Sequence, residues 1–190
     1  MKILILALAL VTATITSCSS NGSKQTSTGN DTIPATAQST NTTGKSALAT
    51  EVVSNYLQLK NALVNDNSKD AATAGKAISE NILSINEADL TAEQRKVYED
   101  VKDDIKEHGE HIGNNAGKIE HQREHFEMIS KDVYDLVKVV GSEQTLFKDH
   151  CPMYNDGKGA DWLSEVKDIK NPYLGKKMPT CGTVKEEIKK

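Results

Sequence analysis

The chain is poor in aromatic residues and cysteine, and its first 107 residues contain no histidine. With one Trp and two Phe among 190 residues, a folded core must consist mostly of aliphatic side chains. The sequence has no glycine-rich phosphate loop, no G-x-S-x-G elbow and no H-E-x-x-H motif. No pair of carboxylates stands out for acid–base catalysis either. These absences predict a protein that is not an enzyme.

A large excess of charge of one sign is also missing. The chain carries 23 Lys and Arg against 27 Asp and Glu, a net charge of −4. Proteins that bind nucleic acid usually concentrate basic residues, so we expect no nucleic-acid partner. The mild acidity slightly favours cations, although it is equally typical of an ordinary surface.

Residues 1–17 predict a signal peptide. Lys2 precedes an apolar run over residues 3–11, which is too short to span a bilayer. The order Ile15-Thr16-Ser17-Cys18 resembles the lipobox of bacterial lipoproteins. The resemblance implies that Cys18 is diacylated and serves as a lipid anchor. The alternative is cleavage near Ser17 that leaves Cys18 as a free thiol.

The segment after the anchor is rich in Ser, Thr, Asn and Gly. Residues 18–46 therefore predict a flexible tether, with a reach of roughly 30 Å. Residues 47–190 suit one domain. We expect a protein of the cell envelope that faces the periplasm and meets the membrane only through its lipid.

Four segments of this domain have helical periodicity, with apolar residues three or four positions apart. They cover residues 48–63, 71–85, 91–112 and 119–140. Thr91 and Gln94 form a capping-box signature, and Gly141 is a C-terminal stop signal. Short connections predict an all-α domain, an antiparallel four-helix bundle. The last 45 or so residues predict a loop-rich tail packed on the bundle, held by its cysteines or by a shared metal.

The histidines lie in the second half of the chain. His121 and His125 are four residues apart, so both leave the same helix face, which Met128 extends. A hairpin at residues 113–117 would bring His108 and His111 to a similar depth, and two to four imidazoles could converge. The alternatives are solvated Glu–His pairs and, for His108, a buried hydrogen-bonded histidine.

Two cysteines of the tail each have a methionine nearby, in Cys151-Pro152-Met153 and in Met178-Pro179-Thr180-Cys181. Thiolates and thioethers suit Cu(I), whereas thioethers are poor zinc ligands. His150 adds an imidazole beside Cys151. Two alternatives stay open. A Cys151–Cys181 disulfide would contribute about 3–4 kcal/mol, and the methionines could simply fill gaps in the core.

Several blocks of sequence resemble one domain of unknown function that is common in Bacteroidota lipoproteins and also occurs fused to periplasmic adaptor subunits of Cus-type heavy-metal efflux pumps. The blocks are residues 119–126, 151–153, 158–164, 171–175 and 178–182. The resemblance implies copper or related metal handling. It assigns the role of metal ligand to His121, His125, Cys151, Met153, Met178 and Cys181. The match is less clear at His108, His111 and His150.

Together these observations predict a non-enzymatic, lipid-anchored periplasmic protein that binds copper, with Cu(I) favoured over Cu(II). Its site would combine sulfur and imidazole ligands between the fourth helix and the tail. Its role would be copper sequestration or delivery to an efflux adaptor. The competing interpretation is a protein-interaction module of the cell envelope with a Cys151–Cys181 disulfide and no metal.

Overall fold

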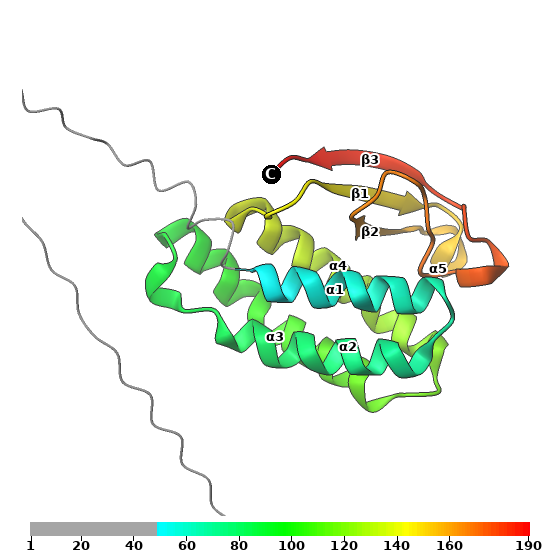
Figure 1. Cartoon of the computed structure of the whole chain (residues 1–190), viewed down its shortest axis with the longest axis horizontal. Coiled ribbons are helices and arrows are strands. Elements are labelled where there is room, and N and C mark those ends of the chain that lie inside the picture. Colours follow the sequence, from blue (N-terminus) through cyan, green and yellow to red (C-terminus); the bar gives the residue numbers. More distant parts are fainter. Residues whose placement is uncertain (1–48) are drawn as a thin grey trace, which may run out of the picture. The chain divides into compact units, whose positions relative to one another are not determined.

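The computed structural model describes residues 49–190. The expected signal peptide, the expected anchor Cys18 and the tether lie outside the described residues. Long helices come first, and a small sheet follows them (Figure 1). The helices are α1 (Thr50–Val64), α2 (Ser68–Asn81), α3 (Ala92–Asn114), α4 (Ile119–Val140) and the short α5 (Tyr154–Gly157), and the strands are β1 (Leu146–Cys151), β2 (Ala160–Ser164) and β3 (Thr183–Ile188). The prediction of a mostly helical domain is confirmed.

Local signals set the ends of the helices much as expected. At the start of α3, the Thr91 side chain accepts a hydrogen bond from the Gln94 N–H, and the Gln94 side chain accepts one from the Thr91 N–H. α4 ends at Gly141, whose φ of +83° suits glycine. α2 ends at Asn81, earlier than predicted, and the chain continues as a 3₁₀ turn over Ile82–Ser84.

Each long helix packs against the next one along the chain. α2 and α3 approach closely where two glycines face each other. A Cβ atom built on Gly109 would lie 2.8 Å from the carbonyl oxygen of Gly75, which is closer than packed atoms tolerate. The absence of a side chain at Gly109 therefore sets the spacing of this helix pair.

We expect Gly109→Ala to destabilise the domain by about 1–3 kcal/mol, because the added methyl group overpacks the α2–α3 contact. This loss should exceed the gain of about 1 kcal/mol in helix propensity. Thermal unfolding measures it, with Glu99→Ala on an exposed position of α3 as the control. A Gly109→Ala variant that is more stable than the parent would contradict the close contact.

The all-α prediction is confirmed only in part, because the tail, which was expected to be loop-rich, also contains a small sheet. The three strands form an antiparallel sheet in the order β2-β1-β3. His150 pairs with Asp161 on one side and with Thr183 on the other. The turn between β1 and β2 uses positive φ values at Asn155 and Asp156, in the segment where turn residues were expected.

The sheet covers one side of the helices, and β2 lies over α1 and α4 (Figure 1). Tyr56 of α1 is central to this contact. Its hydroxyl accepts a hydrogen bond from the Leu163 N–H at 3.0 Å and lies 2.8 Å from the Ser130 hydroxyl of α4. Direct packing between α1 and α4 is sparse, so a closed four-helix bundle is not confirmed.

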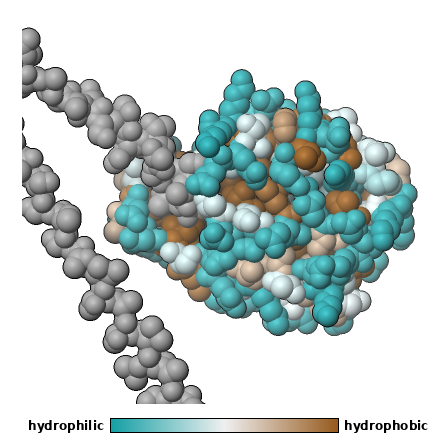
Figure 2. Space-filling model, viewed as in Figure 1, coloured by the Kyte–Doolittle hydropathy of each residue, from teal (hydrophilic) through white to brown (hydrophobic). Residues whose placement is uncertain are grey.

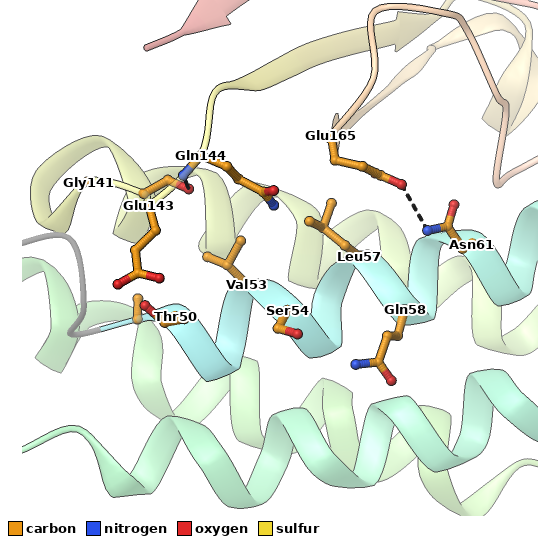
Figure 3. A pocket seen from close by; sticks show the side chains of 12 residues that line it. Thr50, Val53, Ser54, Leu57, Gln58, Asn61, Gly141, Glu143, Gln144 and Glu165 are labelled. Atoms are coloured by element: carbon orange, nitrogen blue, oxygen red, sulfur yellow. Dashed lines mark hydrogen bonds between the residues drawn. The ribbon is translucent and has the colours of Figure 1, made fainter. Parts of the chain in front are cut away.

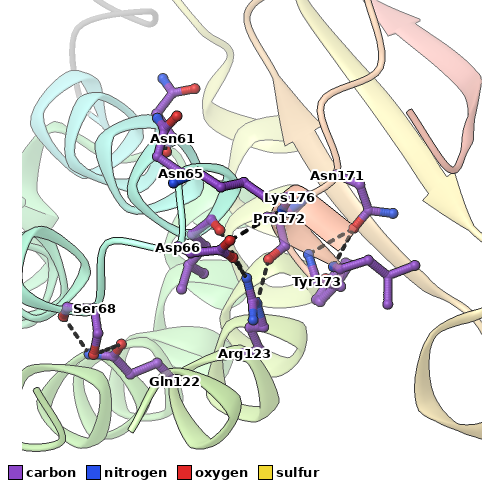
Figure 4. Close-up of polar contacts among 12 residues, drawn as sticks. Asn61, Asn65, Asp66, Ser68, Gln122, Arg123, Asn171, Pro172, Tyr173 and Lys176 are labelled. Atoms are coloured by element: carbon purple, nitrogen blue, oxygen red, sulfur yellow. Dashed lines mark hydrogen bonds and ion pairs between the residues drawn. The ribbon is translucent and has the colours of Figure 1, made fainter. Parts of the chain in front are cut away.

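Arg123 of α4 fastens the tail to the helices (Figure 4). Its Nε donates to the Pro172 carbonyl at 2.8 Å, and its Nη2 donates to the Leu63 carbonyl at 3.1 Å. Nη2 also pairs with the Asp66 carboxylate at 2.5 Å. The tail therefore has a polar attachment that requires neither a disulfide nor a metal.

Hydrophilic residues dominate the visible face, with apolar residues between them (Figure 2). No helix within residues 49–190 is long and apolar enough to cross a membrane.

Candidate functional site

The α3–α4 hairpin brings four imidazoles together. They are His108 and His111 of α3 and His121 and His125 of α4. The rings of His111 and His125 stack with centroids 4.4 Å apart, and the rings of His121 and His125 meet edge to face at 4.6 Å. We call these four residues the histidine cluster. Its geometry agrees with the predicted convergence of imidazoles.

Three members of the cluster are placed to share a metal ion. His111, His121 and His125 each offer one ring nitrogen, and these atoms all lie within 4.8 Å of one another. Metal–nitrogen bonds of about 2.0–2.1 Å would hold such nitrogens about 3.3 Å apart. The side chains of His111 and His121 are 46% and 40% exposed, so small rotations can close the difference.

Neighbouring groups hold two of these rings by their Nδ1 atoms. The Nδ1 of His121 lies 3.1 Å from a Glu124 carboxylate oxygen, and the Nδ1 of His125 lies 3.1 Å from the Nδ1 of His108. Both contacts leave Nε2 available. Metal-ligating histidines usually have such a partner on the second nitrogen. Glu124 and His108 therefore fit the role of positioning residues.

The protonation state of His125 also suits a ligand. Burial lowers the pKa of His125 to about 4, and the nearby His111, His121 and His108 add to this effect. Its imidazole is therefore neutral at physiological pH, which is the form that binds metal.

Acidic side chains surround the histidine cluster. The exposed residues are Glu107, Glu110, Glu120 and Glu124. Their charge attracts cations. Some of it also supports ordinary surface pairs, since Glu107 lies 3.7 Å from the Nε2 of His111.

The two described cysteines meet at a different place. Cys151 ends β1 and Cys181 precedes β3, and the β1–β3 register brings them together. Their sulfur atoms are 3.3 Å apart, and both are free thiols. We call them the thiol pair. Burial raises the pKa of the Cys151 thiol, but hydrogen bonds from Cys181, Met153, Asn171 and Tyr154 bring it below its ordinary value.

The six residues predicted as one site thus lie in two groups. Arg123, which contacts the tail, is about 200° around α4 from His125, so the histidines leave the opposite side of the helix, toward α3. Within residues 49–190, no group of three closely spaced ligand atoms joins a cysteine to a histidine. Met153 and Met178 are 56% and 39% exposed, so neither fills a core gap.

Two members of the histidine cluster, His108 and His111, were not among the six predicted metal ligands. His111 supplies one of the three clustered nitrogens, and His108 contacts His125. His108 lies about as far from the turn between α3 and α4 as His121 does on the other helix, and His111 lies closer to that turn. This spacing is the sequence signal that points to both residues. His150 belongs to neither group, since within residues 49–190 no set of three closely spaced ligand atoms includes it; its Nδ1 lies 2.7 Å from the Asp161 carboxylate.

A groove of about 490 Å³ lies between α1 and the loop that follows α4 (Figure 3). Val53, Leu57, Gln58 and Glu165 are among its lining residues, and the Asn61 amide donates to Glu165 at 3.0 Å. None of the described lining residues is a histidine or a cysteine. The groove is therefore separate from both groups of candidate ligands.

These features define a mostly helical domain with a histidine cluster in one hairpin and a thiol pair on an appended sheet. Residues 52–145 match the family model described as "Protein of unknown function (DUF3347)", so this part of the chain is a domain of unknown function, as expected. The matched range contains the whole histidine cluster and ends before the thiol pair. No curated protein and no solved structure is significantly similar to the chain.

Proposed function

We propose that this chain is a non-enzymatic, lipid-anchored metal-binding protein of the cell envelope, with Cys18 as its anchor and a periplasm-facing domain. The observation that carries the proposal is the set of three histidine nitrogens from two helices within 4.8 Å of one another. Two of these rings also have a partner on Nδ1, as metal-ligating histidines usually do.

Copper is the metal that we propose. Imidazole ligands suit copper, zinc and nickel, and Cu²⁺ has the highest affinity among the divalent ions of this series. Three ligands leave further coordination positions open, and the rings of His111 and His121 are about half exposed. An open, accessible site suits uptake and transfer, so the role we propose is copper sequestration or delivery to a heavy-metal efflux adaptor.

We expect the double variant His121→Ala/His125→Ala to bind Cu²⁺ and Zn²⁺ at least about 100-fold more weakly than the parent, which corresponds to about 2.7 kcal/mol. Two of three ligands are then missing. Competition titration of the purified chain against a chromophoric chelator measures the affinities.

The matched control is His150→Gln, because His150 pairs with Asp161 outside the histidine cluster. It should bind both ions within about twofold of the parent, a difference well below 1 kcal/mol. Equal affinities of the double variant and the parent would exclude the histidine cluster as the metal site.

A second candidate function is an interaction module of the envelope with a Cys151–Cys181 disulfide and no metal. The distance of 3.3 Å between the two sulfurs favours it. Mass spectrometry of the native protein separates the two functions. A deficit of about two daltons with no bound metal supports the interaction module, whereas bound copper, with or without free thiols, supports the metal-binding function.

A further inference from the structure

The thiol pair is chemically distinct from the histidine cluster and takes no part in it. Cys151 is fully buried, while Cys181 is half-buried beside the surface. The side-chain amide of Asn171 serves both residues, since it donates to the Cys181 carbonyl at 2.6 Å and to the Cys151 sulfur. The pair therefore lies at the edge of the hydrophobic core, with Cys181 nearer the surface and the Asn171 amide beside it.

The turn after Cys151 directs backbone donors at its sulfur. Backbone hydrogen bonding from Met153 and Tyr154 contributes to lowering the pKa of the Cys151 thiol. Donors of this kind stabilise a thiolate that binds a metal, and they tune metal–thiolate centres in general.

The surroundings do not suit a divalent tetrahedral ion. A zinc site needs three or four ligands from Cys, His, Asp or Glu. Within residues 49–190, no histidine or carboxylate joins the thiol pair in such a group. The remaining candidates are the thioethers of Met153 and Met178, which lie two and three residues from the cysteines and are unusually exposed for methionine. Two thiolates with thioether neighbours select a soft monovalent ion.

The pair is also poorly arranged for thiol–disulfide exchange with a partner. Exchange needs an accessible nucleophile. Here the sulfur that receives the N–H donors is that of the buried Cys151, whereas the accessible Cys181 receives fewer.

We propose that Cys151 and Cys181 form a second metal site, separate from the histidine cluster, that binds one soft monovalent ion of the Cu(I) class, with Met153 and Met178 at its mouth. Metal–sulfur bonds of about 2.3 Å allow the two sulfurs to lie up to about 4.5 Å apart, so the pair opens by about 1 Å when it is loaded. Cys181 can make this movement because it precedes Gly182 in the loop before β3. The site does not depend on the proposed function of the histidine cluster.

The experiment is an anaerobic titration of the reduced, full-length protein with Cu(I) against a chromophoric Cu(I) chelator. The variants are Cys181→Ser, which alters the half-buried member of the pair, and His121→Ala/His125→Ala. We expect Cys181→Ser to weaken Cu(I) binding at least about 100-fold, while the histidine variant keeps the parent affinity. Circular dichroism of each variant verifies that it is folded.

A second readout uses the parent protein and needs no substitution. Cu(I) should protect Cys181 from alkylation by iodoacetamide, and Zn²⁺ at the same concentration should not. Parent affinity in Cys181→Ser, or loss of Cu(I) binding in the histidine variant alone, would overturn the separate sulfur site. Failure of the histidine cluster to bind Cu²⁺ would leave these Cu(I) results unchanged, so the two proposals fail independently.

Discussion

Replacing Arg123 by alanine should lower the free energy of unfolding by about 3–5 kcal/mol, the cost of leaving two buried backbone carbonyls without their donor and of losing the ion pair with the exposed Asp66. The guanidinium is only 7% exposed and holds three acceptors from different parts of the chain. Its removal leaves the Leu63 and Pro172 carbonyls and the Asp66 carboxylate without this donor. Buried acceptors without a donor are costly, so the tail should detach from the helices.

Thermal unfolding tests this expectation. For a chain of this size, the loss corresponds to a fall in Tm of roughly 6–20 °C. Arg95→Ala is the matched control, because exposed Arg95 donates one hydrogen bond, to the Glu87 carbonyl, and should cost no more than about 1 kcal/mol. Similar losses in both variants would show that Arg123 is not the attachment of the tail.

Arg123 also illustrates what the sequence could not predict. Its partners Leu63 and Pro172 lie 60 and 49 residues away, and no local pattern indicates which charged side chain of a helix will be buried. The helices themselves depend on nearby residues, through the capping box at Thr91 and the stop at Gly141. The bounds of α3 and α4 were therefore predictable to within about two residues, whereas α2 begins and ends earlier than predicted.

The sheet was harder to predict because its strands carry weak patterns. β3 alternates between exposed and half-buried residues over Thr183–Ile188 and has no buried residue, so its sequence lacks a hydrophobic face. β2 has three consecutive buried residues at Trp162–Ser164, which hides the period of two that identifies a strand. Pairing with β1 determines both strands, and such pairing is a long-range property.

The same difference between local and long-range information applies to the candidate ligands. The spacing of His121 and His125 fixes a common helix face, and a hairpin places His111 near them, so the histidine cluster could be predicted from local geometry. Whether the cysteines would reach that face depends on where the sheet packs. The sheet packs on the side of α4 that carries Arg123, so the sulfurs and the imidazoles separate.

Asp149 is the one residue whose replacement we expect to stabilise the domain substantially. It is fully buried on β1, opposite Trp162 of β2 and Val184 of β3. Neither carboxylate oxygen has a hydrogen-bond partner within residues 49–190. Burial raises the pKa of Asp149 from the ordinary 3.8 to about 7, while the charge of Lys60 lowers it in part. Lys60 is itself engaged by Glu165 at 2.7 Å.

The raised pKa fixes the direction of the pH dependence. The folded protein holds a proton on Asp149 that the unfolded chain releases near pH 4. The stabilisation by this proton is complete below that pH and is lost as the pH rises through about 7. The size of the pKa shift limits the loss of folding stability from ionising Asp149 to at most about 4 kcal/mol. We expect Asp149→Asn, which keeps the shape and removes the charge, to be about 2 kcal/mol more stable than the parent at pH 8 and nearly equal to it at pH 4.

Urea unfolding of both proteins at pH 4, 6 and 8 measures the difference. Asp161→Asn on the neighbouring strand is the control, because its effect on stability at pH 8 should have the opposite sign to that of Asp149→Asn. Burial alone would raise the pKa of Asp161, but Lys148 and His150 hold it below its ordinary value, so this change should cost stability at pH 8. A parent whose stability relative to Asp149→Asn did not fall between pH 4 and pH 8 would mean that the Asp149 carboxylate gains a partner in solution. That result would overturn the prediction that an unpartnered, buried Asp149 carboxylate destabilises the folded protein above pH 7.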